Sequence, residues 1–294
     1  MEPRVVLVTR PTAYEELLAA HGTHRQAAWY LERQGQQLDA LKTAQDRRDA
    51  AVAKVIGAIP RGWRQTRVGR RDLDRFLFEP EDVVIPVGPD GLVANVAKYV
   101  RQQVVLGVNP DPAAIDGVLA PHPADAVADL LADLAAGRAR IRLRTMVEAT
   151  TDDGQVLRAL NEVFVGHRSH QSARYTLRAF GRTERQSSSG LIVATGTGAT
   201  GWAASIARVA APTVALPGPT DPVVLLLVRE AWPSRTTGVT LGGGRVEAGA
   251  VEVVSEMDDG GVAFGDGIEQ DAIPLPFARR VTIGRAADGL AWVA

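Results

Sequence analysis

Residues 83–98, VVIPVGPDGLVANVAK, decide the fold class of this chain. The first half is a run of β-branched residues, which is typical of a strand, and the second half is typical of a helix. The turn Gly-Pro-Asp-Gly at 88–91 joins them. A strand that passes through such a turn directly into a helix indicates an α/β unit.

The Gly-Pro-Asp-Gly turn has two interpretations. Glycines at a strand-to-helix junction let backbone N–H groups approach a phosphate at the positive end of the helix. An aspartate there repels phosphate unless it has another task, such as holding Mg²⁺ or accepting a proton from an attacking hydroxyl. The alternative is a simple type I or type II turn, in which Asp90 has no chemical role.

Strand and helix patterns alternate through the first part of the chain. Helical patterns cover residues 14–59, interrupted at Gly22 and Gly35, and residues 124–137; strand patterns cover 4–8, 82–87 and 103–108. This alternation predicts a parallel sheet with helices on its faces. We therefore expect an α/β domain over residues 1–130.

After about residue 138 the apolar residues recur with a period of two, which is typical of half-buried strands. We expect one helix at about 198–209 and strands at 138–149, 156–165, 173–180, 189–194, 245–255, 261–265 and 279–284. The sequence thus predicts a β-rich domain over residues 131–294. Its last strand, within 288–294, is expected to return to the first domain.

Composition excludes several classes of function. The sequence has no cysteine, so thiol catalysis, disulfides and thiolate metal sites are impossible. Lys and Arg number 33 and Asp and Glu number 34, so the formal net charge is −1. The chain therefore has no excess positive charge that would attract nucleic acid or an anionic membrane. No signal-peptide pattern and no long apolar run is present, so we expect a cytoplasmic protein without nucleic-acid or membrane partners.

Two further features are interpreted as solvent-exposed surface. The segment RGWRQTRVGRRDLDR (61–75) has six arginines and could grip a polyphosphate or a nucleic acid, but its interleaved aspartates favour a solvated face. His167 and His170 have no third ligand nearby in the sequence, so we predict no metal site there.

A second stretch, SSSGLIVATGTGATGWAAS (187–205), alternates glycines with hydroxyl residues ahead of a helix. Backbone and side-chain donors of this kind suit anionic or ribose oxygens. The alternative is a flexible turn. The candidate nucleotide-binding residues of this stretch are Thr195, Thr197, Gly198, Thr200, Gly201, Trp202 and Ser205.

A third stretch, RALNEVFVG (158–166), places Asn161 and Glu162 inside an apolar strand pattern. Adjacent strand residues point to opposite faces, so at least one of the pair is expected to face the interior. A buried amide or carboxylate is costly without partners. Ribose hydroxyls of a ligand are suitable partners, and so is the end of a neighbouring strand.

Taken together and in this order, the three stretches resemble the NAD kinase family. That family has a Gly-Gly-Asp-Gly-Thr turn, an Asn-Glu or Asn-Asp pair, and a Thr-Pro-Thr-Gly-Ser-Thr-Ala-Tyr loop after Asp-Gly-Leu. VVLGVNPD (104–111) falls where the family has a Gly-Ile-Asn segment, and VAFGDGIE (262–269) is similar to its Asp-Gly turn. The resemblance covers residues 82–294.

The resemblance implies a Rossmann-like N-terminal domain and a sandwich-like, all-β C-terminal domain with NAD bound between them. Asp90 would activate the 2′-hydroxyl of NAD for attack on the γ-phosphate of ATP, or on polyphosphate, with Mg²⁺ and the turn glycines Gly88 and Gly91. Asn161 and Glu162 would contact the dinucleotide. The resemblance also implies a homodimer or homotetramer.

The chain departs from the family pattern at several positions. Pro89 replaces the second glycine of the turn and removes an N–H donor, and Leu92 replaces the threonine. Ser189, Gly196, Ala199 and Trp202 replace Asp, Pro, Ser and Tyr, and residues 229–235 lack the family's histidine. Two alternatives to an NAD kinase stay open: a regulatory dinucleotide-binding protein without catalysis, and a kinase of a sugar, nucleoside or lipid head group.

Overall fold

The computed structural model describes residues 3–294, which form two units. Of the described residues, 3–142 and 291–294 make the first unit and 143–290 the second, so the chain crosses from one unit to the other twice. The expected boundary at residue 130 falls inside a helix, and the units divide after Arg142. None of the described helices is long and apolar enough to cross a membrane.

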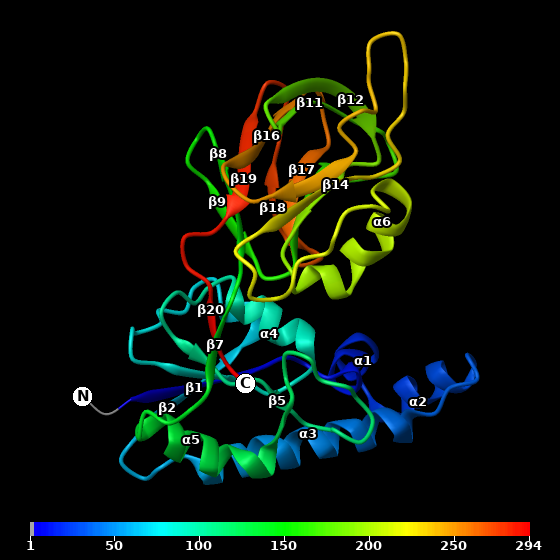
Figure 1. The fold of residues 1–294 in the computed structure, drawn as a ribbon. Coiled ribbons are helices and arrows are strands. Elements are labelled where there is room, and N and C mark those ends of the chain that lie inside the picture. The colour runs from blue at the N-terminus through cyan, green and yellow to red at the C-terminus, as the bar shows by residue number, and fades with distance from the viewer. Residues whose placement is uncertain (1–2) are drawn as a thin grey trace. The chain divides into compact units, whose positions relative to one another are not determined.

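The first unit is an α/β domain (Figure 1). Its elements, in chain order, are β1 (Arg4–Thr9), α1 (Ala13–His21), α2 (His24–Glu32), α3 (Leu38–Ala58), β2 (Arg64–Gly69), the 3₁₀ helix η1 (Arg70–Asp72), β3 (Val83–Pro86), α4 (Asp90–Ala97), β4 (Val104–Val105), β5 (Val108–Asn109), β6 (His122–Pro123), the 3₁₀ helix η2 (Ala124–Ala126) and α5 (Val127–Ala135).

A six-stranded sheet forms the centre of this unit, in the order β2-β1-β3-β4-β20-β7, with β7 (Ile141–Arg144) and β20 (Leu290–Val293) as its last two strands. β1 pairs in parallel with both β2 and β3, and β20 pairs in parallel with β4. Helices α3 and α5 lie on one face of the sheet, where Val55 and Leu131 pack against Val5 and Ile85, and α4 lies on the other face (Figure 1).

The second unit consists mainly of antiparallel strands. Its elements are β8 (Val147–Thr151), β9 (Val156–Ala159), β10 (Glu162–His167), β11 (Ala173–Ala179), β12 (Arg182–Ser188), β13 (Leu191–Ala194), the 3₁₀ helix η3 (Gly198–Thr200), α6 (Trp202–Ala210), β14 (Val224–Val228), β15 (Gly243–Val246), β16 (Ala250–Ser255), β17 (Gly261–Gly265), β18 (Ile268–Pro274) and β19 (Arg280–Arg285).

Two six-stranded sheets share one apolar core in this unit. Their orders are β15-β14-β13-β10-β17-β18 and β12-β11-β16-β19-β8-β9. Val163 and Val193 of the first sheet belong to the same buried cluster as Leu177 and Val253 of the second. Helix α6 covers the outer face of the first sheet, where Ala203 packs with buried residues of β13 and β14 (Figure 1). The chain is therefore a mixed α/β protein with many strands.

The expectation of one continuous strand over 156–165 is wrong. The chain bends at residues 160 and 161, so that β9 lies in one sheet and β10 in the other. Asn161 occupies the bend and Glu162 is the first residue of β10. Their polarity therefore marks a crossing between two sheets, where the backbone leaves one ladder of hydrogen bonds and joins another.

Strand β2 was not expected, since its segment was interpreted only as a solvated face. It is an edge strand in which every residue except Val68 is at least partly exposed. Its arginines are compatible with a strand because charged side chains on an edge discourage pairing with other chains.

Candidate functional site

The Gly-Pro-Asp-Gly turn leaves the carboxyl end of β3 in the first unit. Its neighbours hold it from two sides: Val87 N–H donates to the Val8 carbonyl at 2.9 Å, and Gly88 N–H donates to the Val108 carbonyl at 3.0 Å. Asp90 is the first residue of α4, where its negative charge is favourable beside the positive end of the helix. The turn and the helix start therefore lie at the sheet edge where α/β proteins bind ligands.

The Asp90 carboxylate binds a segment of backbone distant in sequence. Oδ1 accepts hydrogen bonds from Leu119 N–H at 2.9 Å and Ala120 N–H at 3.0 Å, and Oδ2 accepts one from Val118 N–H at 2.9 Å. A carboxylate has about four acceptor positions, so these three bonds leave about one, on Oδ2. Asp90 therefore organises the 118–120 segment, whatever else it does.

The 118–120 segment is itself tightly packed. The Trp292 indole Nε1–H donates to the Leu119 carbonyl at 2.8 Å. A Cβ at Gly107 would lie 2.2 Å from that same carbonyl oxygen, and a Cβ at Gly117 would lie 2.0 Å from the Ala120 carbonyl oxygen. Only glycine fits at these two positions, so Asp90 faces a fixed row of backbone donors.

In the second unit, hydrogen bonds to Asp266 hold the bend at Asn161 and Glu162 in place. The Asp266 carboxylate accepts hydrogen bonds from the N–H groups of Leu160 at 3.0 Å and Asn161 at 2.7 Å, and a longer one from Glu162 at 3.4 Å. Asp266 has a φ of 55°, in a region that aspartate tolerates better than most residues. This turn residue therefore fixes the conformation of the Asn-Glu pair.

Thr195 attaches the glycine- and threonine-rich loop to the same bend. This fully buried residue donates from Oγ1 to the Leu160 carbonyl at 2.5 Å and from its backbone N–H to the Asn161 carbonyl at 2.8 Å. Its Oγ1 also accepts hydrogen bonds from the N–H groups of Thr197 and Gly198. The structure thus brings the Asn-Glu pair and the start of the loop together.

Gly198 lies directly against the Asn-Glu pair. A Cβ there would lie 2.3 Å from the Asn161 carbonyl oxygen and 2.9 Å from the Glu162 Oε2. Glu162 is only 7 % exposed. Burial, and to a lesser extent the negative charge of Asp266, raises the pKa of Glu162 to about 7. A carboxyl group with this pKa can exist in either protonation state near neutral pH.

The remaining candidate residues lie at the start of α6. Thr200 and Gly201 are exposed, and Trp202 and Ser205 line a cavity of about 420 Å³. On its other side, Trp202 lines a second cavity of about 560 Å³ with Phe164, whose ring centroid is 6.1 Å away. The Arg229 guanidinium is 5.1 Å from the Trp202 ring centroid. This aromatic and cationic surface suits a flat, conjugated ring.

Asp266, Phe164 and Arg229 belong to the site but are not among the residues that the sequence predicts for it. In the sequence Asp266 is visible only as part of an Asp-Gly turn, and that turn is the signal for a polar anchor. Phe164 and Arg229 carry no local signal. Their contacts with Trp202 arise from the antiparallel pairing of β10 with β13 and of β13 with β14.

Replacing Gly198 by alanine is expected to destabilise the protein by about 1–3 kcal/mol, because the new methyl group forces the loop away from Asn161 and Glu162. Chemical denaturation measures this change in the free energy of unfolding. Gly57→Ala is the matched control, since a Cβ at this helical position meets no atom within 4 Å and the change is expected to stabilise. Equal effects of the two changes would contradict the packing described here.

Comparison with known proteins identifies the fold. No family model matches the sequence, and neither does any curated protein. Among solved structures, yeast NADH kinase complexed with NADH matches with a TM-score of 0.64 and 14% identity, over 100% of this chain and 84% of that chain. An NAD kinase from Archaeoglobus fulgidus in complex with ATP matches with a TM-score of 0.56 and 16% identity, over 99% and 93% of the two chains. The chain therefore has an NAD kinase-like fold.

Proposed function

We propose that this protein is an NAD kinase-like phosphotransferase that transfers the γ-phosphate of ATP, or a terminal phosphate of polyphosphate, to the 2′-hydroxyl of NAD. The fold supports a kinase of this type, since the two solved structures of the same fold are kinases crystallised with NADH and with ATP. The residues of the second unit support a dinucleotide as the ligand. The product of this reaction is NADP.

The observation that carries the proposal is the cluster around Glu162. Three backbone hydrogen bonds to Asp266 fix the bend at Asn161, and Thr195 fixes the loop against it. Burial disfavours the charged form of the Glu162 carboxyl group, and its pKa is therefore raised to about 7. Keeping this group ionised in the folded protein costs stability. Costly polar groups of this kind are concentrated at binding sites, and a pair of ribose hydroxyls would supply the missing partners.

Asp90 is assigned the role of general base. In the transfer, the oxygen of the 2′-hydroxyl forms a bond to the γ-phosphorus, the bond from that phosphorus to the bridging oxygen breaks, and the hydroxyl proton passes to the carboxylate. The acceptor position left on Oδ2 is available for this proton. Phosphoryl transfer depends mainly on positioning and charge neutralisation, so a single base is sufficient side-chain chemistry.

We assign Mg²⁺ to the ATP substrate, which binds the protein as its magnesium complex. Among residues 3–294, no group of three or more His, Asp or Glu side chains is arranged to hold a metal ion. Mg²⁺ is commonly held by one or two carboxylates together with the phosphates of the substrate. The ion therefore belongs with the donor substrate, for which it neutralises phosphate charge.

Two other functions are supported by particular observations. The three hydrogen bonds to Asp90 and the missing N–H of Pro89 favour a dinucleotide-binding protein without catalysis. The large ring of Trp202 beside two cavities favours a kinase with a different acceptor, such as a sugar, a nucleoside or a lipid head group.

A coupled assay with an NADP-specific dehydrogenase tests the proposal on purified protein supplied with NAD, Mg²⁺ and either ATP or polyphosphate. NADP formation with one of the donors is the expected result. Saturable NAD binding by calorimetry without NADP formation would assign the dinucleotide-binding protein instead. Absence of both NAD binding and NADP formation would refute a dinucleotide acceptor.

A further inference from the structure

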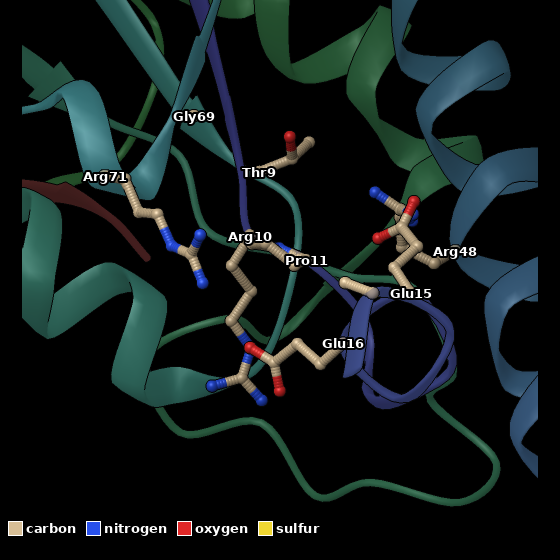
Figure 2. Close-up of a pocket in the computed structure, with 9 residues that line it drawn as sticks. Thr9, Arg10, Pro11, Glu15, Glu16, Arg48, Gly69 and Arg71 are labelled. Carbon is tan, nitrogen blue, oxygen red and sulfur yellow. The ribbon is translucent and has the colours of Figure 1, made fainter. Parts of the chain in front are cut away.

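A cavity of about 510 Å³ lies in the first unit, at the carboxyl ends of β1 and β2 (Figure 2). Its volume is within the range of small-molecule sites. Three arginines from separate segments contribute to its walls, and nine residues line it: Thr9, Arg10, Pro11, Glu15, Glu16, Ala19, Arg48, Gly69 and Arg71.

The position of this cavity in the sheet favours a ligand. In the sheet, β1 lies between β2 and β3. Along the sequence, β1 is followed by β2 on one side of it and then by β3 on the other side. This reversal of strand order is where open α/β sheets bind ligands, beyond the carboxyl ends of the strands. Arg10 follows β1, and the 88–91 turn follows β3, so both leave the same edge from adjacent strands.

One of the three arginines is already neutralised. Arg48 forms ion pairs with Glu15 at 2.7 Å and with Asp49 at 2.9 Å. Glu15 also accepts a hydrogen bond from the backbone N–H of Thr12, as part of the capping box of α1. Arg48 and Glu15 therefore form a structural wall of the cavity and contribute little net charge to it.

Arg10 and Arg71 supply the positive charge of the cavity. Both side chains are exposed, and within residues 3–294 neither has an ion pair or a side-chain hydrogen bond. Figure 2 shows them extending from the segments that follow β1 and β2, while Arg48 and Glu15 lie together on another side. Among the described residues that line the cavity, Glu16 is the opposing carboxylate for which no ion pair is formed, so two guanidinium groups face one carboxylate.

We propose that this cavity binds a chain of phosphates, with Arg10 and Arg71 as the side chains that contact it. Guanidinium groups bind phosphate oxygens through paired, charge-assisted hydrogen bonds, and two of them on different segments match a ligand with successive phosphates. The phosphate chain is either the tail of a nucleoside triphosphate or inorganic polyphosphate. Its use as a phosphate donor rests on the proposed function, but its binding does not.

Calorimetric titration with inorganic tripolyphosphate and with ATP tests this proposal. Arg10→Gln and Arg71→Gln are each expected to weaken binding by about 10- to 100-fold, because each removes a charge-assisted contact. Arg25→Gln is the matched control, an exposed arginine of the same unit outside the cavity, and is expected to leave binding unchanged. Glu16→Gln is expected to tighten binding, since it removes the opposing charge.

Comparing tripolyphosphate with ATP distinguishes inorganic polyphosphate from a nucleoside triphosphate as the natural ligand. Equal, arginine-dependent affinity for both ligands assigns the site to the phosphate chain alone, and arginine-dependent binding of ATP only assigns it to a nucleotide. Binding that neither arginine variant weakens, or no binding of either ligand, overturns the proposal. NADP formation with an unchanged KM for the donor in both variants would overturn the use of this cavity as the donor site, while leaving the proposed function intact.

Discussion

Replacing Asp90 by asparagine is expected to lower the rate of NADP formation by about 100- to 10,000-fold, the usual contribution of a general base. The amide cannot accept the proton of the 2′-hydroxyl. The change also has a structural effect, since the amide nitrogen must take the place of one oxygen that now accepts from Val118, Leu119 or Ala120. The measurement is kcat in the NADP-forming assay, together with the thermal stability of the same preparation.

A second variant separates these two effects. Trp292→Phe removes the indole hydrogen bond to the Leu119 carbonyl and so loosens the same segment while leaving the Asp90 carboxylate in place. Catalysis by Asp90 requires that Asp90→Asn lose far more activity than Trp292→Phe at comparable loss of stability. If the two variants lose activity in proportion to stability, Asp90 acts only as an anchor for the 118–120 segment.

Replacing Glu162 by glutamine is expected to stabilise the protein at pH 8 by on the order of 1–3 kcal/mol. The folded-state pKa of about 7 lies above the ordinary 4.5, so the folded protein binds a proton between these values that the unfolded chain has released. The contribution of Glu162 to stability is therefore present below pH 4.5 and is lost as the pH rises to about 7. Glutamine has no such loss, so the two proteins should be equally stable near pH 4.

Glu184→Gln is the control for this experiment, because it should show the opposite sign. Although partial burial opposes it, hydrogen bonds from Thr240, Gln186 and Leu241 hold the pKa of Glu184 at about 2. Its contribution is present above pH 4.5 and is lost as the pH falls toward 2, so its removal should destabilise the protein at pH 8. Denaturation curves from pH 4 to 8 measure both variants. A Glu162→Gln protein less stable than the wild type at pH 8 would contradict the burial described for Glu162.

A carboxyl group that destabilises the folded protein is expected to be kept because it contributes to ligand binding. The same Glu162→Gln protein is therefore expected to bind NAD more weakly while being more stable. Calorimetry on this variant measures the loss of affinity directly, because stability and binding change in opposite directions.

Local pattern predicts several elements of uniform character, although the all-apolar strand β14 is not among the expected strands. The β-branched run before the 88–91 turn corresponds to β3, and Gly22 and Gly35 do separate α1, α2 and α3. Strands β2 and β12 are not among the expected strands because polar and charged residues dominate both. β2 pairs with β1, which is distant in sequence, whereas β12 forms a hairpin with the adjacent β11. Their burial patterns show how little of these strands faces a core.

The candidate site was predictable in its composition but not in its contacts. Asn161, Glu162 and the loop from Thr195 were selected as unusual polar residues, and the structure places them against each other. Asp266 holds this bend across more than 100 residues of sequence, and no local pattern specifies that pairing. The hydrogen bonds that the backbone N–H groups of residues 118–120 donate to Asp90 are equally unpredictable, since backbone N–H groups have no signature in the sequence.

The most direct test of the central claim is to follow the reaction of NAD with ATP and Mg²⁺ by phosphorus NMR. Phosphate transfer predicts one new phosphomonoester signal, on the 2′-oxygen of the adenosine ribose of NAD, that grows in step with ADP. ATP and NAD that stay unconverted under conditions in which calorimetry shows both to be bound, with no phosphorylation of NAD when polyphosphate replaces ATP, would contradict an NAD kinase.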